Sequence, residues 1–154
     1  MVTAKEILKT YWNDTIPIDP AAIAVQMGVN VLGSANFGEE SGHYLPEGHE
    51  KNPTIIYNAR ESKVRQRFTI AHELGHHVLG HGDSPRDSAY PANARDPVER
   101  AANAFAAELL MPEETVKALI HVRGLRSVTD LRDAFGVSAA AMQYRLKDLG
   151  YRVG

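Results

Sequence analysis

Residues Arg67–His81 contain a His-Glu-x-x-His motif, made by His72, Glu73 and His76, within a run whose apolar residues recur at helical spacing. A helix advances about 100° per residue, so the two histidines lie about 40° apart with Glu73 beside them. Two imidazoles in this arrangement can share one metal ion, and the carboxylate is placed to act as a general base. A helix with an ordinary wetted histidine face is the alternative. Because Glu73 occupies the one position that metal-assisted hydrolysis requires, the motif predicts a zinc site.

The apolar residues of this run fall mostly on the arc opposite the two histidines: Phe68, Ala71, Leu74, Val78 and Leu79. This pattern predicts that the helix buries one side, while the side with the histidines lines a cleft. Gly75 lies on the buried arc, where a missing side chain would let a neighbouring helix come close.

The composition of the 154-residue chain, 44% hydrophobic with a net charge of −2, suits a domain with a substantial core and gives no overall signature of nucleic-acid or anionic-membrane binding. The absence of cysteine excludes disulfides and thiolate ligands, which leaves His, Asp and Glu as zinc ligands. The N-terminus has no signal-peptide pattern and no stretch is long enough to cross a bilayer. We therefore expect a cytoplasmic protein.

Local patterns predict a small sheet between helices. Capping residues and breakers predict helices over residues 3–13, 19–28, 62–79 and 97–111, with a strand at 29–32 and a hairpin formed by 42–45 and 54–57. An edge strand of this sheet could hold an extended peptide across the metal, or the sheet could serve packing alone. Residues 80–96 lack apolar periodicity and are predicted to form a long loop.

A catalytic zinc site keeps three protein ligands and one open position, so a third ligand must come from elsewhere in the chain. Glu99 is the preferred candidate because it lies in the first turn of the following helix. Asn103 lies on the same face of that helix and could hydrogen-bond a ligating histidine or the Glu99 carboxylate. Other candidates at less suitable positions are His77, His81, Asp83, Asp87 and Glu108.

Two segments together, residues 67–76 and the pattern from Glu99 through Asn103 to Pro112, resemble the ImmA/IrrE family of metallo-endopeptidases. The similarity extends upstream to Pro17-Ile18-Asp19 and Gly42-His43-Tyr44. The resemblance implies an α+β fold with zincin-like helices packed on a small, mostly antiparallel sheet. It further implies that Glu99 is the third ligand of one Zn²⁺ ion and that Glu73 is the catalytic base. The resemblance also implies a cytoplasmic protease that cuts helix-turn-helix repressors of the XRE type.

The C-terminal residues 128–150 read as a helix, a glycine-containing turn and a serine-capped helix, which is a helix-turn-helix pattern. We expect a metallopeptidase domain over residues 1–122 and a helical appendage over 123–154 that packs on it. A DNA reader would expose Gln143, Tyr144, Arg145 and Lys147 on the second helix, but Asp148 follows them. A packing or substrate-docking role is therefore favoured over DNA binding.

The predicted reaction is hydrolysis of a peptide bond by a metal-activated water, whose proton Glu73 accepts and later passes to the leaving amine. Candidate donors to the developing oxyanion or to substrate are Tyr44, Tyr57 and Tyr90. The alternative function is a regulatory or toxin–antitoxin partner that binds a repressor or DNA without cutting it.

Overall fold

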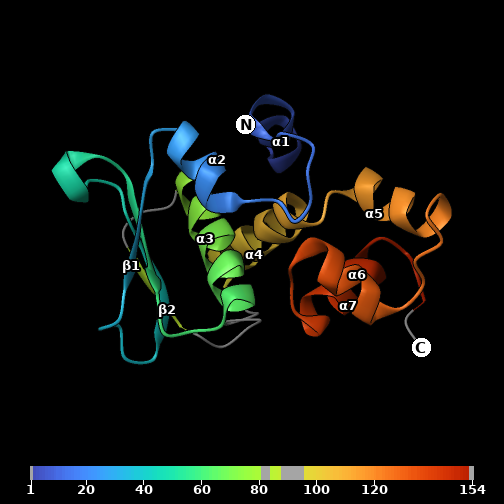
Figure 1. Ribbon diagram of the computed structural model, residues 1–154. Coiled ribbons are helices and arrows are strands. Elements are labelled where there is room, and N and C mark those ends of the chain that lie inside the picture. The colour runs from blue at the N-terminus through green and yellow to red at the C-terminus, as the bar shows by residue number, and fades with distance from the viewer. Residues whose placement is uncertain (1, 81–83, 88–95, 153–154) are drawn as a thin grey trace.

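Seven helices and a four-stranded sheet make up the part of the chain that the computed structural model describes, residues 2–80, 84–87 and 96–152 (Figure 1). The fold class is α+β, as predicted. The helices are α1 (Ala4–Tyr11), α2 (Pro20–Gln26), α3 (Lys63–Val78), α4 (Pro97–Leu110), α5 (Glu113–His121), α6 (Val128–Phe135) and α7 (Ala139–Asp148). The strands are β1 (Asn30–Ser34), β2 (Glu40–Leu45), β3 (Thr54–Asn58) and β4 (Ser84–Asp87), with a short 3₁₀ turn, η1 (His49–Lys51), between β2 and β3.

Most helices begin at a short polar side chain that accepts a backbone N–H of the first turn. Thr3 accepts the N–H of Glu6 at the start of α1, and Ser62 accepts that of Arg65 at the start of α3. The same role falls to Asp19, Asp96, Ser127 and Ser138. Such caps satisfy N–H groups that the helix itself cannot pair, so the predicted starts of these helices were set by local sequence.

The sheet has the order β1-β3-β2-β4 and is mostly antiparallel, as predicted. Strands β2 and β3 form the predicted hairpin, with Tyr44 opposite Ile55 and Gly42 opposite Tyr57. Strand β1 runs parallel to β3 at one edge. At the other edge, β4 pairs antiparallel with β2, with an irregularity of register between Glu40 and Gly42.

Strand β4 corrects the prediction that residues 80–96 form one long loop. It pairs with β2 through main-chain groups, and Ser84-Pro85-Arg86-Asp87 has none of the apolar alternation that marks a strand in sequence. An edge strand needs a partner on one side only and tolerates proline, so side-chain periodicity does not reveal it. The rest of the predicted loop, residues 81–83 and 88–95, lies outside the described part of the chain.

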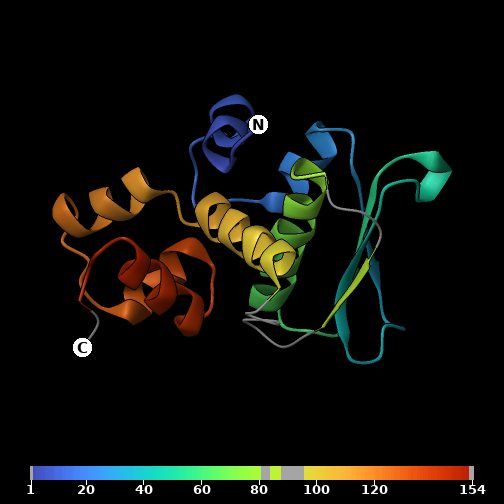
Figure 2. The ribbon, with the colours of Figure 1, turned by 180° about the vertical axis from the view of Figure 1, so that it is seen from behind.

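Helix α3 lies between the sheet on one side and α4 on the other, and Figure 2 shows the same arrangement from behind. The expected burial of the apolar side is confirmed, but the expectation that the side with the histidines is open to a cleft was wrong. Residues Phe68–His76 are all buried, because β2 covers the side that carries Glu73 while α4 covers Gly75. The predicted close approach at Gly75 is confirmed, since a Cβ there would lie 3.1 Å from the Phe105 ring and 3.3 Å from the Ala102 Cα.

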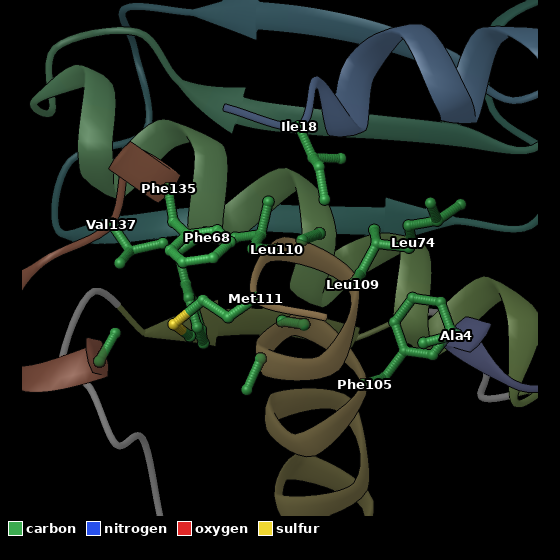
Figure 3. Close-up of a cluster of buried hydrophobic side chains, with 14 of the residues drawn as sticks. Ala4, Ile18, Phe68, Leu74, Phe105, Leu109, Leu110, Met111, Phe135 and Val137 are labelled. Carbon is green, nitrogen blue, oxygen red and sulfur yellow. The ribbon is translucent and has the colours of Figure 1, made fainter. Parts of the chain in front are cut away.

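The C-terminal helices share the hydrophobic core of the rest of the chain. Leu131, Phe135 and Met142 belong to the same buried cluster as Phe68 and Leu110, and Figure 3 shows part of this cluster around the C-terminal end of α4. Burial of these side chains is the main force that holds the helical pair in place. The domain boundary at residues 122–123 remains a prediction.

Arg67 also joins α3 to the C-terminal helices. Its Nε donates to the Gly136 carbonyl at 3.0 Å. Its Nη2 donates to the Phe135 carbonyl at 3.2 Å and also to the Ile18 carbonyl. Burial lowers the pKa of Arg67, and the nearby Asp19 opposes this effect. Gly136 ends α6 with a φ of 66°, and a Cβ there would lie 2.9 Å from the Arg67 Nε.

Arg145 does not lie where a DNA-reading helix would need it. It is only 5% exposed, and its Nε donates to the Met111 carbonyl at 2.9 Å. Its Nη1 lies 3.3 Å from an Asp148 carboxylate oxygen. Gln143, Tyr144 and Lys147 are exposed on α7. Among the described helices, none is both long and apolar enough to cross a lipid bilayer.

Candidate metal centre

Three side chains from two helices converge at a buried point between α3 and α4. His72 and His76 lie one turn apart on α3, and Glu99 comes from the first turn of α4. The Nε2 atoms of the two histidines are 3.1 Å apart, and each lies 3.2 Å from a different carboxylate oxygen of Glu99. Exposure is 6% for His72, 0% for His76 and 7% for Glu99. The structure thus brings together the three residues that were expected to be ligands.

The spacing of these donor atoms fits a divalent cation. Zinc bonds of about 2.0–2.1 Å in a tetrahedral arrangement place neighbouring donor atoms about 3.3 Å apart. The observed separations of 3.1 and 3.2 Å lie close to that spacing. Two imidazoles that face each other through Nε2, together with a carboxylate, are also costly to bury unless a cation compensates them. His72, His76 and Glu99 can therefore hold a metal ion through two nitrogens and a carboxylate.

Nδ1 of His72 is buried and has no hydrogen-bond partner within the described residues. A ligating imidazole usually donates this second N–H to a carboxylate, a carbonyl or water, which fixes the ring. Asn103 lies one turn after Glu99 on α4, so the two residues share one face of the helix. Asn103 is 9% exposed. Its hydrogen bond to a ligating histidine or to the Glu99 carboxylate remains a prediction.

Glu73 is fully buried beside the two histidines, under the main chain of β2. A Cβ at Gly42 would lie 3.4 Å from the Glu73 Cγ, 2.5 Å from the Thr69 Cγ2 and 3.1 Å from the Ile56 carbonyl oxygen. Only glycine allows the strand to lie this close to α3. Sequence reasoning did not single out Gly42 for this position, although a glycine inside a strand signals a close backbone approach.

The tyrosine candidates lie in different places. The Tyr44 hydroxyl is 2.7 Å from Nδ1 of His77, and the two rings meet edge to face with centroids 5.5 Å apart. Burial raises the pKa of Tyr44 and lowers the pKa of His77. The Tyr44 hydroxyl therefore ties β2 to α3, one residue beyond His76. A role for this hydroxyl toward an oxyanion remains a prediction.

Tyr57 lies opposite Gly42 in the hairpin register, on the face of the sheet that also carries Tyr44. Its ring covers Gly33 of β1, where a Cβ would lie 2.9 Å from the ring. Tyr90, His81 and Asp83 lie outside the described residues, and Asp87 falls in β4. Glu108 is exposed near the far end of α4 from Glu99, so it is not near the cluster.

A family model described as the IrrE N-terminal-like domain, Peptidase_M78, matches residues 25–147, from the end of α2 through most of α7. The chain belongs to the ImmA/IrrE family. All three residues of the cluster and Glu73 fall within the matched range, so the family resemblance and the observed geometry concern the same part of the molecule.

Three proteins illustrate this kinship. The radiation response metalloprotease IrrE of Deinococcus deserti is 32% identical over 117 residues, and that of Deinococcus radiodurans is 33% identical over 117 residues. Each alignment covers 72% of this chain, but only 40% and 34% of the respective relative. The uncharacterized immunity region protein 2 of Bacillus phage phi105 is 29% identical over 99 residues, which covers 64% of this chain and 61% of the phage protein. The chain therefore spans well under half of either IrrE protein.

Proposed function

We propose that this chain is a zinc-dependent endopeptidase that hydrolyses a peptide bond in a helix-turn-helix repressor of the XRE type. The observation that carries the proposal is the convergence of His72, His76 and Glu99 within 4.8 Å, with Glu73 buried beside them on α3. The metalloprotease names of the two IrrE relatives support the reaction class. The phage relative, named for an immunity region, supports a repressor as the substrate class.

His72, His76 and Glu99 would hold the ion. When bound, zinc would supply a Lewis acid that lowers the pKa of a water molecule and polarises the carbonyl of the scissile bond. Three protein ligands are the number that catalytic zinc sites use, since they leave one position for water or substrate. The set contains no thiolate, which also separates it from most structural zinc sites.

Glu73 would hold and move the proton. It follows His72 directly in α3, so its carboxylate starts from the same turn as the ligands. We assign it the role of accepting the proton of the attacking water and passing it to the leaving amine. Gly42 keeps the backbone of β2 at van der Waals distance from the Glu73 side chain, which limits where the carboxylate can go.

The first experiment is incubation of the purified protein with helix-turn-helix repressors of the XRE type from the same organism, with and without a chelator. Zinc-dependent fragments, mapped by mass spectrometry, are the expected result. A stable complex with no fragments at any zinc concentration would instead favour a non-catalytic regulatory partner.

Two variants separate metal binding from chemistry. Glu73→Gln should retain one zinc per chain by elemental analysis and lose cleavage, because it removes only the base. Glu99→Ala should lose zinc and cleavage together. Glu47→Ala, an exposed glutamate in the turn between β2 and β3, is the matched control and should change neither. Full zinc in Glu99→Ala would show that the third ligand lies elsewhere.

A further inference from the structure

A groove of about 850 Å³ lies at the opposite end of α4 from the metal cluster. Residues of α1, α4, α5 and α7 line it, and Figures 1 and 2 show α1 and α5 flanking the C-terminal end of α4. Glu108 lines the groove, nine residues after Glu99, which is about 14 Å along the helix axis. The groove is therefore distinct from the site that would cut the peptide bond, but is built on the same helix.

Part of the groove lining is apolar or aromatic. Leu8 and Trp12 come from α1 and the residue after it, and Pro112 and Leu149 precede α5 and follow α7. The Trp12 indole N–H donates to the Thr15 carbonyl at 2.8 Å, which fixes the ring. A volume of this size lies within the range of pockets that hold ligands or peptide side chains.

Charges of both signs line this groove: those from α1 and from α4 differ in sign, while α5 and α7 each contribute both signs. Lys5 and Lys9 lie one turn apart on α1, and Glu108, Glu113 and Glu114 lie on α4 and α5. Glu113 is already engaged, because its carboxylate lies 2.6 Å from Lys117. Lys117 foremost, with Arg145 and Lys5, holds the pKa of Glu113 below its usual range.

Lys9, Glu108 and Glu114 have no ion-pair partner within the described residues, so an occupant could pair with them. The lining holds five carboxylates against four cations, the latter being Lys5, Lys9, Lys117 and Arg145. A polyanion such as DNA or an anionic membrane would be repelled by the carboxylates. A protein helix that carries an apolar stripe between acidic and basic side chains matches the apolar part of the lining and the opposite charges that α1 and α4 contribute.

We propose that this groove binds a helical segment of the protein substrate, with acidic side chains toward Lys5 and Lys9 and a basic side chain toward Glu108 and Glu114. The inference rests on the proposed function, because it gives the peptidase a docking site remote from the scissile bond. Such a site raises specificity for the folded substrate without touching the reacting atoms.

Trp12 is the only tryptophan of the chain, so a single fluorine label can report on the groove. The Glu73→Gln protein, labelled with 5-fluorotryptophan, is titrated with an unlabelled helix-turn-helix repressor of the XRE type and followed by fluorine NMR. A shift of the single Trp12 resonance at saturation is expected. An unchanged resonance at saturating repressor would overturn the proposal, and so would the same shift produced by duplex DNA alone.

A charge exchange tests the polarity of the groove in the active protein. The double variant Lys9→Glu/Glu108→Lys keeps the net charge but exchanges one charge of α1 with one charge of α4. It should raise the KM for the intact repressor on the order of tenfold, the effect of about one lost charge interaction. Its kcat, and its cleavage of a short peptide that spans the mapped bond, should not change. The matched control is the exchange Glu50→Lys/Lys51→Glu in η1, at the other end of the molecule (Figure 1).

The two proposals can fail separately. Cleavage of the repressor with equal KM values for the groove exchange and the control would overturn the docking site and leave the peptidase standing. A repressor that shifts the Trp12 resonance but is never cut would overturn the proposed reaction and support the groove as a binding surface.

Discussion

The contact between β2 and α3 at Gly42 allows a prediction whose size follows from the structure. In Gly42→Ala, the new Cβ would lie 2.5 Å from the Thr69 Cγ2 and 3.1 Å from the Ile56 carbonyl oxygen. Carbon atoms in favourable contact lie about 3.5–4.0 Å apart, so the methyl group of Thr69 must move by about 1 Å. Thr69 is 4% exposed and the Ile56 oxygen belongs to β3, one of the two inner strands of the sheet, so neither can yield freely.

Overpacking of a well-packed interior costs about 1–3 kcal/mol, and we expect Gly42→Ala to lie at the upper end, about 2–3 kcal/mol. Thr69→Ser removes the obstructing methyl group. Alone it should lower the free energy of unfolding by about 1 kcal/mol, because less apolar surface is buried. In the double variant the new methyl group occupies the space that the old one left. Its total loss should therefore be about 1–2 kcal/mol, rather than the 3–4 kcal/mol that additivity would give.

Urea denaturation of the four proteins, followed by far-ultraviolet circular dichroism, measures these free energies of unfolding. The expected coupling between the two substitutions is about 2 kcal/mol and favours the double variant. If the losses of the single variants simply add, the Cβ at residue 42 does not meet the Thr69 methyl group, and the close approach of β2 to α3 is not as described.

Three further predictions concern two contacts of α3 and the binding of zinc at the candidate metal centre. Gly75→Ala, whose Cβ would lie 3.1 Å from the Phe105 ring, should push α4 outward and weaken zinc affinity by about tenfold, as measured by competition with a chelating dye. Arg67→Lys cannot span its carbonyl partners and should lower the free energy of unfolding by about 2 kcal/mol in urea, while the exposed Arg60→Lys should change it little. Zinc at a hundredfold excess over its Kd should stabilise the wild type by about 2.7 kcal/mol in thermal unfolding, and Glu99→Ala should abolish that gain.

Local sequence predicted the elements that begin at a capping side chain and the candidate ligands that share a helical repeat. The pair His72 and His76 needs only the geometry of one helix, and Glu99 was accessible because Asp96-Pro97 marks the start of α4. Strand β4 was not predictable, because main-chain pairing decides it. The burial of both sides of α3 was also missed, since a polar side packed against a strand looks like a polar side exposed to water.

Arg145 illustrates the same limit. On sequence alone it belonged with the side chains that a DNA-reading helix would expose. In the structure it reaches back to the carbonyl of Met111, which ends α4, and is buried there. The contact joins residues 34 positions apart, so no local pattern could have indicated it.

Gly42 and Gly75 are close contacts on opposite sides of α3. We expect a substitution at Gly75 to change metal binding and one at Gly42 to change turnover. Gly75 lies about 200° around the helix from Glu73, so Gly42 borders the proposed base while Gly75 borders α4, which supplies Glu99. A methyl group at residue 75 acts on the distance between α3 and α4, and excess zinc should therefore restore kcat. A methyl group at residue 42 acts on Glu73 and Thr69, so kcat should stay low at saturating zinc while zinc affinity stays near that of the wild type. If excess zinc restored both variants equally, the two sides of α3 would not act independently, and the placement of Glu73 would depend on the metal itself.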